Sequence, residues 1–260
     1  MPELPEVEFA SRVLRKAVVG RTVTRVRVLH RAQSRGLPRR HVARVVGARI
    51  TGVERRGKHQ LLSLSTGDTL VVHFRMTGDW AVETVGDPAH RFARVIIDLD
   101  DGTRVSLVDP RALSTVTLAL PGTSPVPALG PDAADPNVDV RVFENALSRR
   151  RIPIKVALLD QRVLAGVGNI YAAEALWLAR IDPRVAANAL TRARAARLLV
   201  AIRSVLEKAQ ASSGRYRETA EGRFEVYDRE GEPCSRCRTL IRRITQAGRS
   251  TYFCPQCQKR

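Results

Sequence analysis

Four cysteines near the end of the chain constrain its fold more than any other feature. They form two Cys-x2-Cys pairs, Cys234/Cys237 and Cys254/Cys257, with sixteen residues between the pairs. A two-residue gap lets both thiolates of a pair bind one metal ion, and two such pairs are typical of a four-cysteine zinc site. Redox-active dithiols are the alternative, but they are seldom doubled at this spacing. The pattern predicts one structural Zn2+ ion, with no open coordination position, in a metal-dependent module over 224–260.

The charge of the chain indicates a polyanionic partner. Its 260 residues hold 44 Lys and Arg against 26 Asp and Glu, a net charge of +18, and only five of the 44 are lysines. The basic residues concentrate in 21–58 and 234–260. Arginine suits bidentate contact with phosphate, so nucleic acid is the first candidate and an anionic membrane surface the second. Codon bias would explain the excess of Arg over Lys but not the net charge.

The first residues and the hydropathy bear on the compartment. The chain begins Met-Pro-Glu-Leu-Pro-Glu-Val-Glu, which is acidic and unlike a signal peptide, and no run of 18 apolar residues follows. We therefore expect no membrane association and a reducing compartment, the cytoplasm. In that compartment the cysteines favour metal binding over disulfides.

Periodicity predicts an α+β chain of several domains. Helical spacing over 2–16 precedes six short β-branched runs, which predicts a two-layered β-sandwich with an N-terminal helix over 1–120. The runs are 22–29, 61–64, 70–74, 95–99, 105–108 and 116–120. Residues 121–137, rich in Pro and Gly, predict a linker or hinge.

Helical spacing returns after the linker. It covers 142–147, 154–159, 169–178 and 191–208, and a polar stretch at 211–223 predicts a loop. These segments predict a helical domain with a loop over 138–223, followed by the cysteine module at 224–260. Within it, Gly166 and Gly168 precede Asn169, which we expect to be a helix N-cap. Free N–H groups there would suit an anion, but taken alone the segment favours an ordinary helix corner with a capping Asn.

The amino terminus carries residues suited to covalent chemistry. Once Met1 is removed, Pro2 bears a secondary amine, and an α-amino pKa of about 7.7–8.0 leaves part of it neutral near pH 7. Such an amine attacks an aldehyde-like carbon and forms an iminium ion. Glu3 and Glu6 would lie on one side of the predicted helix, one as acid/base and the other orienting it. Taken alone, the same residues favour a simpler interpretation, ordinary helix-start chemistry.

Sequence blocks along the whole chain resemble one family. They are Pro2-Glu3-Leu4-Pro5-Glu6-Val7-Glu8, Gly57-Lys58, His73-Phe74-Arg75-Met76-Thr77-Gly78, Asp109-Pro110-Arg111, the stretch 161–169 and the stretch 248–258. In this order they are similar to the formamidopyrimidine-DNA glycosylases, bifunctional enzymes of base-excision repair. The resemblance implies a β-sandwich with a helix, a hinge, a helix–two-turns–helix domain and a C-terminal zinc-finger β-hairpin.

The resemblance also implies roles for matching residues. Pro2 would be the nucleophile at C1′ of the damaged nucleotide, Glu3 the acid/base and Glu6 its support. Lys58 would hold a phosphate and assist catalysis. The other implied DNA contacts are His73, Asn169, Tyr227 and Arg249 to phosphates, and Met76, Arg111 and Leu113 in the gap left by the flipped nucleotide.

The implied activity is that of a DNA glycosylase and AP lyase. It would excise oxidised bases, formamidopyrimidine and also 8-oxoguanine, through a Schiff base on the N-terminal proline, and cleave the strand by β,δ-elimination. The implied partner is double-stranded DNA with damaged bases or abasic sites. The enzyme would act as a monomer at the bacterial nucleoid.

Two other activities are alternatives to this one. An endonuclease VIII-like glycosylase for oxidised pyrimidines is disfavoured by Leu4, because that sister group usually has Gly at this position. A non-catalytic zinc-finger DNA-binding protein is disfavoured by the intact Pro2, Glu3 and Lys58.

The chain departs from the family pattern at several positions. Arg75, Asp228 and Arg238 stand where Gly is usual, and Ala112-Leu113-Ser114 stands where the family has Arg-Phe-Gly. The stretch 209–223 is shorter than the loop that caps 8-oxoguanine in the family. These departures predict weaker excision of 8-oxoguanine, with formamidopyrimidine, oxidised-pyrimidine and abasic-site activity retained.

Overall fold

A computed structural model describes residues 2–211 and 224–259 of the chain. Most of the loop predicted at 211–223 therefore lies outside the described residues. The chain divides into two compact units, Met1–Pro127 and Ala128–Arg260, and the division falls inside the predicted linker. Among the described residues no helix is long and apolar enough to cross a membrane.

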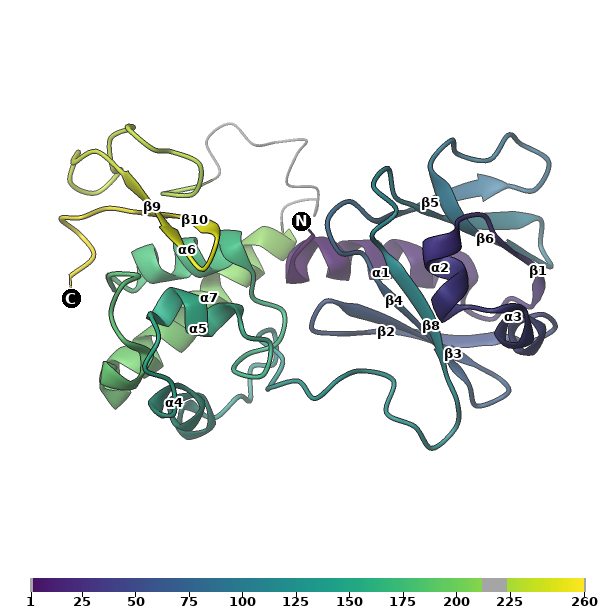
Figure 1. Cartoon of the computed structure of the whole chain (residues 1–260), viewed down its shortest axis with the longest axis horizontal. Coiled ribbons are helices and arrows are strands. Elements are labelled where there is room, and N and C mark those ends of the chain that lie inside the picture. The colour runs from purple at the N-terminus through teal and green to yellow at the C-terminus, as the bar shows by residue number, and fades with distance from the viewer. Residues whose placement is uncertain (1, 212–223, 260) are drawn as a thin grey trace. The chain divides into compact units, whose positions relative to one another are not determined.

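Two antiparallel four-stranded sheets and one long helix build the first unit (Figure 1). One sheet has the order β1 (Val23–Val28), β6 (Ala93–Leu99), β7 (Thr103–Val108) and β5 (Asp79–Thr84). The other has the order β2 (Ile50–Arg56), β3 (His59–Leu64), β4 (Thr69–His73) and β8 (Thr115–Ala119). Helix α1 (Leu4–Val18) precedes them, and α2 (Arg31–Gly36) and α3 (Arg39–Val45) join β1 to β2. The predicted sandwich with an N-terminal helix is confirmed.

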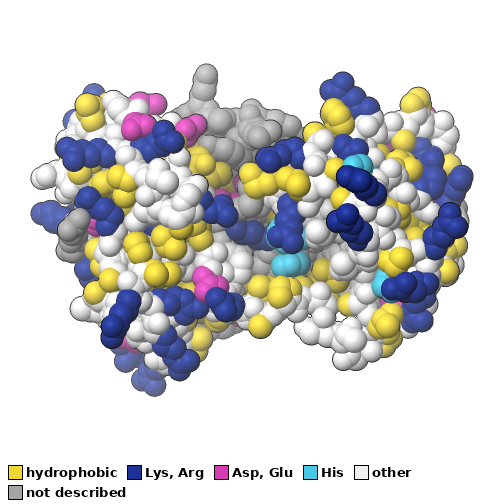
Figure 2. All heavy atoms as spheres, in the orientation of Figure 1, with side chains coloured by type: hydrophobic (Ala, Val, Ile, Leu, Met, Phe, Trp, Pro, Cys, Tyr) yellow, Lys and Arg dark blue, Asp and Glu magenta, His cyan; other side chains and the backbone are white. Residues whose placement is uncertain are grey.

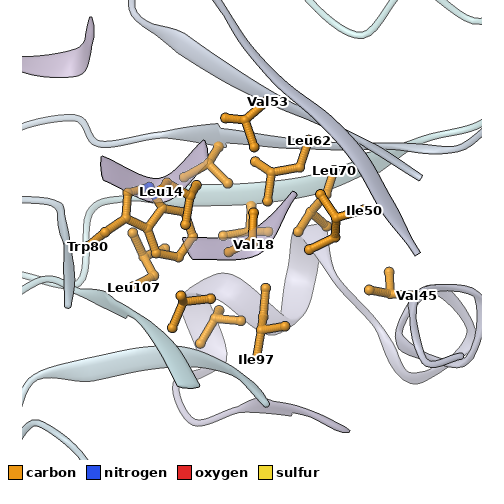
Figure 3. Close-up of a cluster of buried hydrophobic side chains, with 14 of the residues drawn as sticks. Leu14, Val18, Val45, Ile50, Val53, Leu62, Leu70, Trp80, Ile97 and Leu107 are labelled. Atoms are coloured by element: carbon orange, nitrogen blue, oxygen red, sulfur yellow. The ribbon is translucent and has the colours of Figure 1, made fainter. Parts of the chain in front are cut away.

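The apolar face of α1 closes the core of this unit. Val7, Leu14 and Val18 follow helical spacing, are at most 1 % exposed, and belong to the same buried cluster as residues from both sheets. Figure 3 shows Leu14 and Val18 among Leu62 of one sheet and Trp80 of the other. Burial of side chains of this size stabilises the fold by about 1.5–3 kcal/mol each. The helix and the two sheets are therefore held together by one core.

Several elements of the first unit differ from the sequence prediction. Helix α1 begins at Leu4 rather than at residue 2, because Glu3 has the extended backbone of an N-cap. Strands β2 and β5 and helices α2 and α3 were not predicted. Strand β2 contains Gly52 and a register irregularity, which interrupt the alternating pattern by which a half-buried strand is recognised.

Helices and a small hairpin build the second unit. Its elements are α4 (Val140–Ser148), α5 (Ile154–Leu159), α6 (Asn169–Leu178), the 3-10 turn η1 (Ala187–Ala189), α7 (Arg192–Ala211), β9 (Arg242–Gln246) and β10 (Arg249–Phe253). The predicted segments 154–159 and 169–178 match α5 and α6 residue for residue. The helical region and the zinc-module hairpin expected from the family resemblance are confirmed.

The N-terminus of α6 corrects one expectation. Gly168, with φ −130° and ψ −160°, is the N-cap, and Asn169 is the first helical residue. The Asn169 amide donates instead to the carbonyl oxygen of Ser250 in β10, at 3.0 Å. A contact far away in the sequence thus replaces the expected local cap.

Candidate active site and nucleic-acid interface

The amino-terminal segment is ordered by a reciprocal contact between two glutamates. The backbone N–H of Glu3 donates to the carboxylate of Glu6 at 2.8 Å. Glu3 is 1 % exposed and lies outside the helix, so the two side chains do not project from one helical face as expected. Pro2, half-buried, directly precedes this fixed residue. Glu6 thus fixes the backbone of Glu3, the residue that follows Pro2.

Lys58 lies in a tight turn that is tied to helix α1. Gly57 and Lys58 join β2 to β3, and Gly57 has φ +59°, in the left-handed region that favours glycine. The Nε of Arg55 is 2.9 Å from the Glu8 carboxylate in α1, and its Nη1 donates to the carbonyl oxygen of Gly57 at 2.9 Å. Lys58 itself is 7 % exposed. Arg55 thus fixes the turn of Lys58 to the helix that follows Pro2 and Glu3.

His73 is held as a neutral hydrogen-bond donor. It lies opposite His59 on the neighbouring strand, with ring centroids 4.7 Å apart, and its Nδ1 accepts from the backbone N–H of Arg75 at 3.0 Å. Burial, followed by the charges of His59, Arg75 and Lys58, lowers the pKa of His73 to about 3. Burial also lowers the pKa of His59. With Nδ1 an acceptor, the proton of neutral His73 resides on Nε2, which can donate to a phosphate oxygen.

Two neighbouring loops present the three residues expected to fill a gap in duplex DNA. Met76 follows β4 and is 38 % exposed, while Leu113 precedes β8 and is 43 % exposed. Arg111 is also exposed. Large apolar side chains left this exposed on ordered loops are suited to insertion between bases.

Asp109 joins those two loops. Its buried carboxylate accepts hydrogen bonds from the Thr77 hydroxyl and from the backbone N–H groups of Arg111 at 3.1 Å and Ser114 at 2.6 Å. Burial alone would raise the pKa of Asp109, but these donors outweigh it and the pKa lies below its usual value. Gln33 of α2 adds a hydrogen bond to the Ser114 carbonyl oxygen at 2.7 Å. These hydrogen bonds thus link the loop of Met76 to the loop that carries Arg111 and Leu113.

The departures from the family pattern fall at unusual backbone conformations. Arg75, Ala112, Asp228 and Arg238 have φ of +56°, +53°, +61° and +63°. Three of the four stand where the family usually has glycine, for which this left-handed region carries no penalty. These positions therefore carry a backbone strain that glycine would not carry.

A buried lysine organises Asn169 and the start of β10. The Nζ of Lys155, which is fully buried in α5, donates to the Asn169 side chain and lies 3.4 Å from the carbonyl oxygen of Ser250. Asn169 donates to the same carbonyl oxygen. Because Arg249 directly precedes Ser250, this network fixes two of the predicted phosphate-binding residues relative to each other.

Tyr227 is placed by another buried carboxylate, that of Glu174 on α6. Glu174 accepts hydrogen bonds from the backbone N–H groups of Glu225, Val226 and Tyr227 at 2.8–3.0 Å. Burial outweighs these bonds and raises the pKa of Glu174. The Tyr227 ring meets that of Tyr252 in β10, with centroids 5.2 Å apart. Helix α6 therefore supports both Asn169 and Tyr227.

The four cysteines form the expected metal site. Their Sγ atoms all lie within 4.8 Å of one another, with Cys237 and Cys254 at 3.5 Å and Cys234 and Cys257 at 4.0 Å. A tetrahedral zinc ion with Zn–S bonds of about 2.3 Å separates its sulfur ligands by about 3.8 Å. The residues fit one structural zinc ion. The β9–β10 hairpin carries Arg242, Arg243 and Arg249, all exposed.

Sequence reasoning missed the residues that hold the predicted site residues in place. Arg55, Gln33, Lys155 and Glu174 act over long separations in the chain, which no local pattern reveals. Lys155 is one of only five lysines in the chain, and the structure shows that it is buried, as is Lys58.

Comparisons with known proteins agree with this geometry along the whole chain. The formamidopyrimidine-DNA glycosylase N-terminal domain matches residues 1–116, the H2TH domain of the same enzymes matches 129–219, and the zinc finger found in FPG and IleRS matches 231–260. The formamidopyrimidine-DNA glycosylase of Rhizorhabdus wittichii is 40% identical over 273 residues, covering 100% of both chains. That of Chloroflexus aurantiacus is 41% identical over 271 residues, covering 99% of this chain and 98% of the relative.

Solved structures give the same result. Lactococcus lactis formamidopyrimidine-DNA glycosylase, non-covalently bound to DNA containing an AP site, superposes with a TM-score of 0.92 at 31% identity, covering 99% of this chain and 100% of that one. MutM in complex with DNA containing carbocyclic 8-oxo-G has a TM-score of 0.90 at 31% identity, and both chains are covered completely.

Fold and site together define a zinc-finger DNA glycosylase of the helix–two-turns–helix class. Within that class the assignment is specific, because all three domain matches and the full-length relatives agree. The chain belongs to the formamidopyrimidine-DNA glycosylase family.

Proposed function

We propose that the protein removes oxidised bases from duplex DNA and cleaves the strand at the resulting abasic site, with the nitrogen of Pro2 as the nucleophile. After removal of Met1, this nitrogen attacks C1′ of the damaged nucleotide and the N-glycosidic bond breaks. The C1′–O4′ bond then opens, with protonation of O4′, and leaves an iminium ion at C1′. This ion acidifies C2′, so that β-elimination expels the 3′ phosphate and δ-elimination then expels the 5′ phosphate.

The observation that carries the proposal is the ordered amino-terminal segment. Glu3 is buried and its backbone is bound to the Glu6 carboxylate, so Pro2 adjoins a carboxyl group of fixed position. A carboxyl group placed in this way suits the proton transfers of ring opening and elimination. Lys58, on a turn tied to α1 through Arg55, supplies the positive charge for a phosphate next to the lesion.

The remaining residues bind and deform the DNA in this proposal. His73, Asn169, Tyr227 and Arg249 contact phosphates that flank the extruded nucleotide. Met76, Arg111 and Leu113 enter the gap and replace the lost stacking, which offsets an extrusion cost of a few kcal/mol. In Figure 2 dark blue Lys and Arg side chains are more prominent than magenta Asp and Glu, as binding to a polyanion requires.

Each predicted domain has a task in this proposal. Residues 1–120 carry the chemistry, 121–137 form a hinge, 138–223 bind DNA through the helix–two-turns–helix, and 224–260 form the zinc finger. The curated relatives matched here come from bacteria, and we propose that the protein acts in the bacterial cytoplasm on nucleoid DNA.

Borohydride trapping tests the nucleophile. Reduction of a Schiff base with abasic duplex should give a covalent complex for protein that begins at Pro2. A variant with an uncleaved extension before Pro2 should bind the same duplex but give no complex and no strand cleavage. Full activity of the extended variant would mean that an amine other than the Pro2 nitrogen is the nucleophile.

A panel of damaged duplexes tests the substrate. Formamidopyrimidine and abasic-site duplexes should be cleaved efficiently, and 8-oxoguanine less so, as the shortened 209–223 stretch predicts. A preference for thymine glycol over formamidopyrimidine would favour the endonuclease VIII-like alternative.

A further inference from the structure

Arg94 lies at an irregularity of strand β6 that redirects its side chain. The residue before it pairs with Val108 and the residue after it with Leu107, so Arg94 is an extra residue relative to β7. A bulge of this kind aims a side chain away from the regular alternation of its strand. The guanidinium of Arg94, which is half-buried, thereby reaches the turn that follows β7.

Two carbonyl oxygens of that turn accept hydrogen bonds from Arg94. Its Nε donates to the Asp109 carbonyl oxygen at 2.6 Å, and its Nη2 donates to the Pro110 carbonyl oxygen at 3.1 Å. The backbone N–H of Asp109 donates in turn to the carbonyl oxygen of Phe92, at 3.0 Å. A guanidinium carries its charge on a rigid fork of donors, so it holds two oxygens in one fixed geometry. Phe92 and Arg94 thus bind the backbone of the turn at three points.

The peptide group between Pro110 and Arg111 is fixed at both of its polar ends. Its carbonyl oxygen is the one that Arg94 binds, and its N–H donates to the Asp109 carboxylate at 3.1 Å. Because this planar group ends at the Cα of Arg111, it sets the direction in which the exposed Arg111 side chain leaves the backbone. Arg94 therefore acts on Arg111 through the backbone and needs no contact with its side chain.

We propose that Arg94 is a positioning residue for Arg111, and that it raises the preference of the protein for DNA with a vacated base position. The inference rests on the proposed function, in which Arg111 enters the gap left by the extruded nucleotide. A side chain enters such a gap more tightly when its backbone is already in place, because the ordering then occurs on folding and not on binding. Without Arg94, the peptide group before Arg111 loses one of its two fixed ends.

The ratio of two affinities tests the proposal. Fluorescence anisotropy gives the dissociation constants of the full-length protein for an undamaged duplex and for the same duplex carrying tetrahydrofuran, a stable abasic analogue, so that no bond is cleaved. Arg111→Ala should reduce the preference for the abasic duplex about tenfold, and Arg94→Met should reduce it nearly as much.

Arg91→Met is the matched control. It removes the same charge from an exposed arginine, whose Cζ lies 4.5 Å from the centroid of the Phe92 ring. Loss of a surface charge weakens binding to both duplexes alike, so the preference should stay within about twofold of wild type. Equal preference for Arg94→Met and Arg91→Met contradicts the proposal.

The double variant separates positioning from general damage. If Arg94 acts through Arg111, then Arg94→Met should change the preference less than about twofold in the Arg111→Ala background. Losses that multiply in the double variant contradict the proposal. Should Arg94→Met fail to fold, Arg94→Lys takes its place, since it keeps the charge but presents a single nitrogen to the two carbonyl oxygens. A wild-type preference in Arg111→Ala would instead contradict the proposed role of Arg111 in the gap, and this inference with it.

Discussion

Arg238 has a strained backbone conformation that the folded chain tolerates. Its backbone has φ +63°, where a residue with a side chain is disfavoured by about 1–2 kcal/mol. Glycine removes that cost but gives the unfolded chain extra freedom worth about 0.5–1 kcal/mol. We expect Arg238→Gly to stabilise the zinc-loaded protein by up to about 1 kcal/mol, measured by urea or thermal unfolding.

Arg242 provides the control for that substitution. It is also an exposed arginine of the zinc module, but it lies in the extended strand β9. Arg242→Gly should therefore destabilise the protein slightly. A stabilising effect of both substitutions, or of neither, would contradict the explanation by backbone strain.

His73 makes the stability of the first unit depend on pH. The pKa of His73 falls from 6.5 to about 3 on folding, so between these values the unfolded chain binds a proton that the folded chain does not. The contribution of neutral His73 is complete above about pH 6.5 and is lost as the pH falls towards 3, with a slope of at most about 1.4 kcal/mol per pH unit.

The His73→Gln variant measures this contribution. Urea unfolding from pH 5 to 8 should show a shallower decline below pH 6.5 for the variant than for the wild-type protein. His59, whose pKa is also lowered, leaves a residual slope in the same direction. Identical slopes for both proteins would mean that His73 is not held neutral by the fold.

At the scale of elements, Asp109 connects the loop after β4 to the loop before β8. Asp109→Asn replaces one acceptor oxygen by a donor and leaves a buried N–H without its partner, which costs about 1–3 kcal/mol. The loops that carry Met76 and Leu113 should lose their rigid support. We expect kcat/KM for base excision from duplex DNA to fall roughly tenfold, measured in single-lesion assays.

Asp101→Asn is the matched control for Asp109. Asp101 also has a lowered pKa through a backbone N–H donor, that of Thr103, but it lies in the β6–β7 turn. Its replacement should leave excision within about twofold of wild type. Equal losses in both variants would indicate general destabilisation rather than a role for the two loops.

Helices of the second unit were predictable because their signals are local. The apolar spacing of 154–159 and the glycines before Asn169 define α5 and α6 without reference to the rest of the chain. The segments of α2 and α3 are rich in arginine and have little apolar period, so only packing against β8 and β1 reveals them as helices. Strand β2 is hidden by Gly52 and its register irregularity.

The residues of the candidate site were predictable from the sequence, but the contacts that hold them in place were not. Pro2, Glu3 and Lys58 emerge from the family resemblance, and the zinc ligands from spacing alone. The hydrogen bond from Asn169 to Ser250 spans 81 residues, and the one from Gln33 to Ser114 spans 81 as well. Partners this far apart are set by tertiary packing, so the sequence pattern suggested a helix cap for Asn169 instead.

At the scale of the whole molecule, salt dependence separates charged from neutral phosphate contacts. Arg249→Ala should weaken binding to all duplexes and reduce the slope of log K against log salt by about 0.9, because one counterion fewer is released. His73→Gln should leave that slope unchanged, since His73 is neutral above pH 5. Titrations of an abasic duplex by fluorescence anisotropy over a range of salt concentrations measure both.

These two variants also test each other. A reduced slope for His73→Gln would mean that His73 binds DNA as a cation, in conflict with its lowered pKa. An unchanged slope for Arg249→Ala would remove Arg249 from the phosphate contacts.

Mass spectrometry of the trapped protein–DNA complex tests the proposed nucleophile most directly. After borohydride reduction and proteolysis, the deoxyribose remnant should be found on the peptide that begins at Pro2, attached to its nitrogen, with Met1 absent. A remnant attached to a lysine, or active enzyme that still carries Met1, would contradict the account.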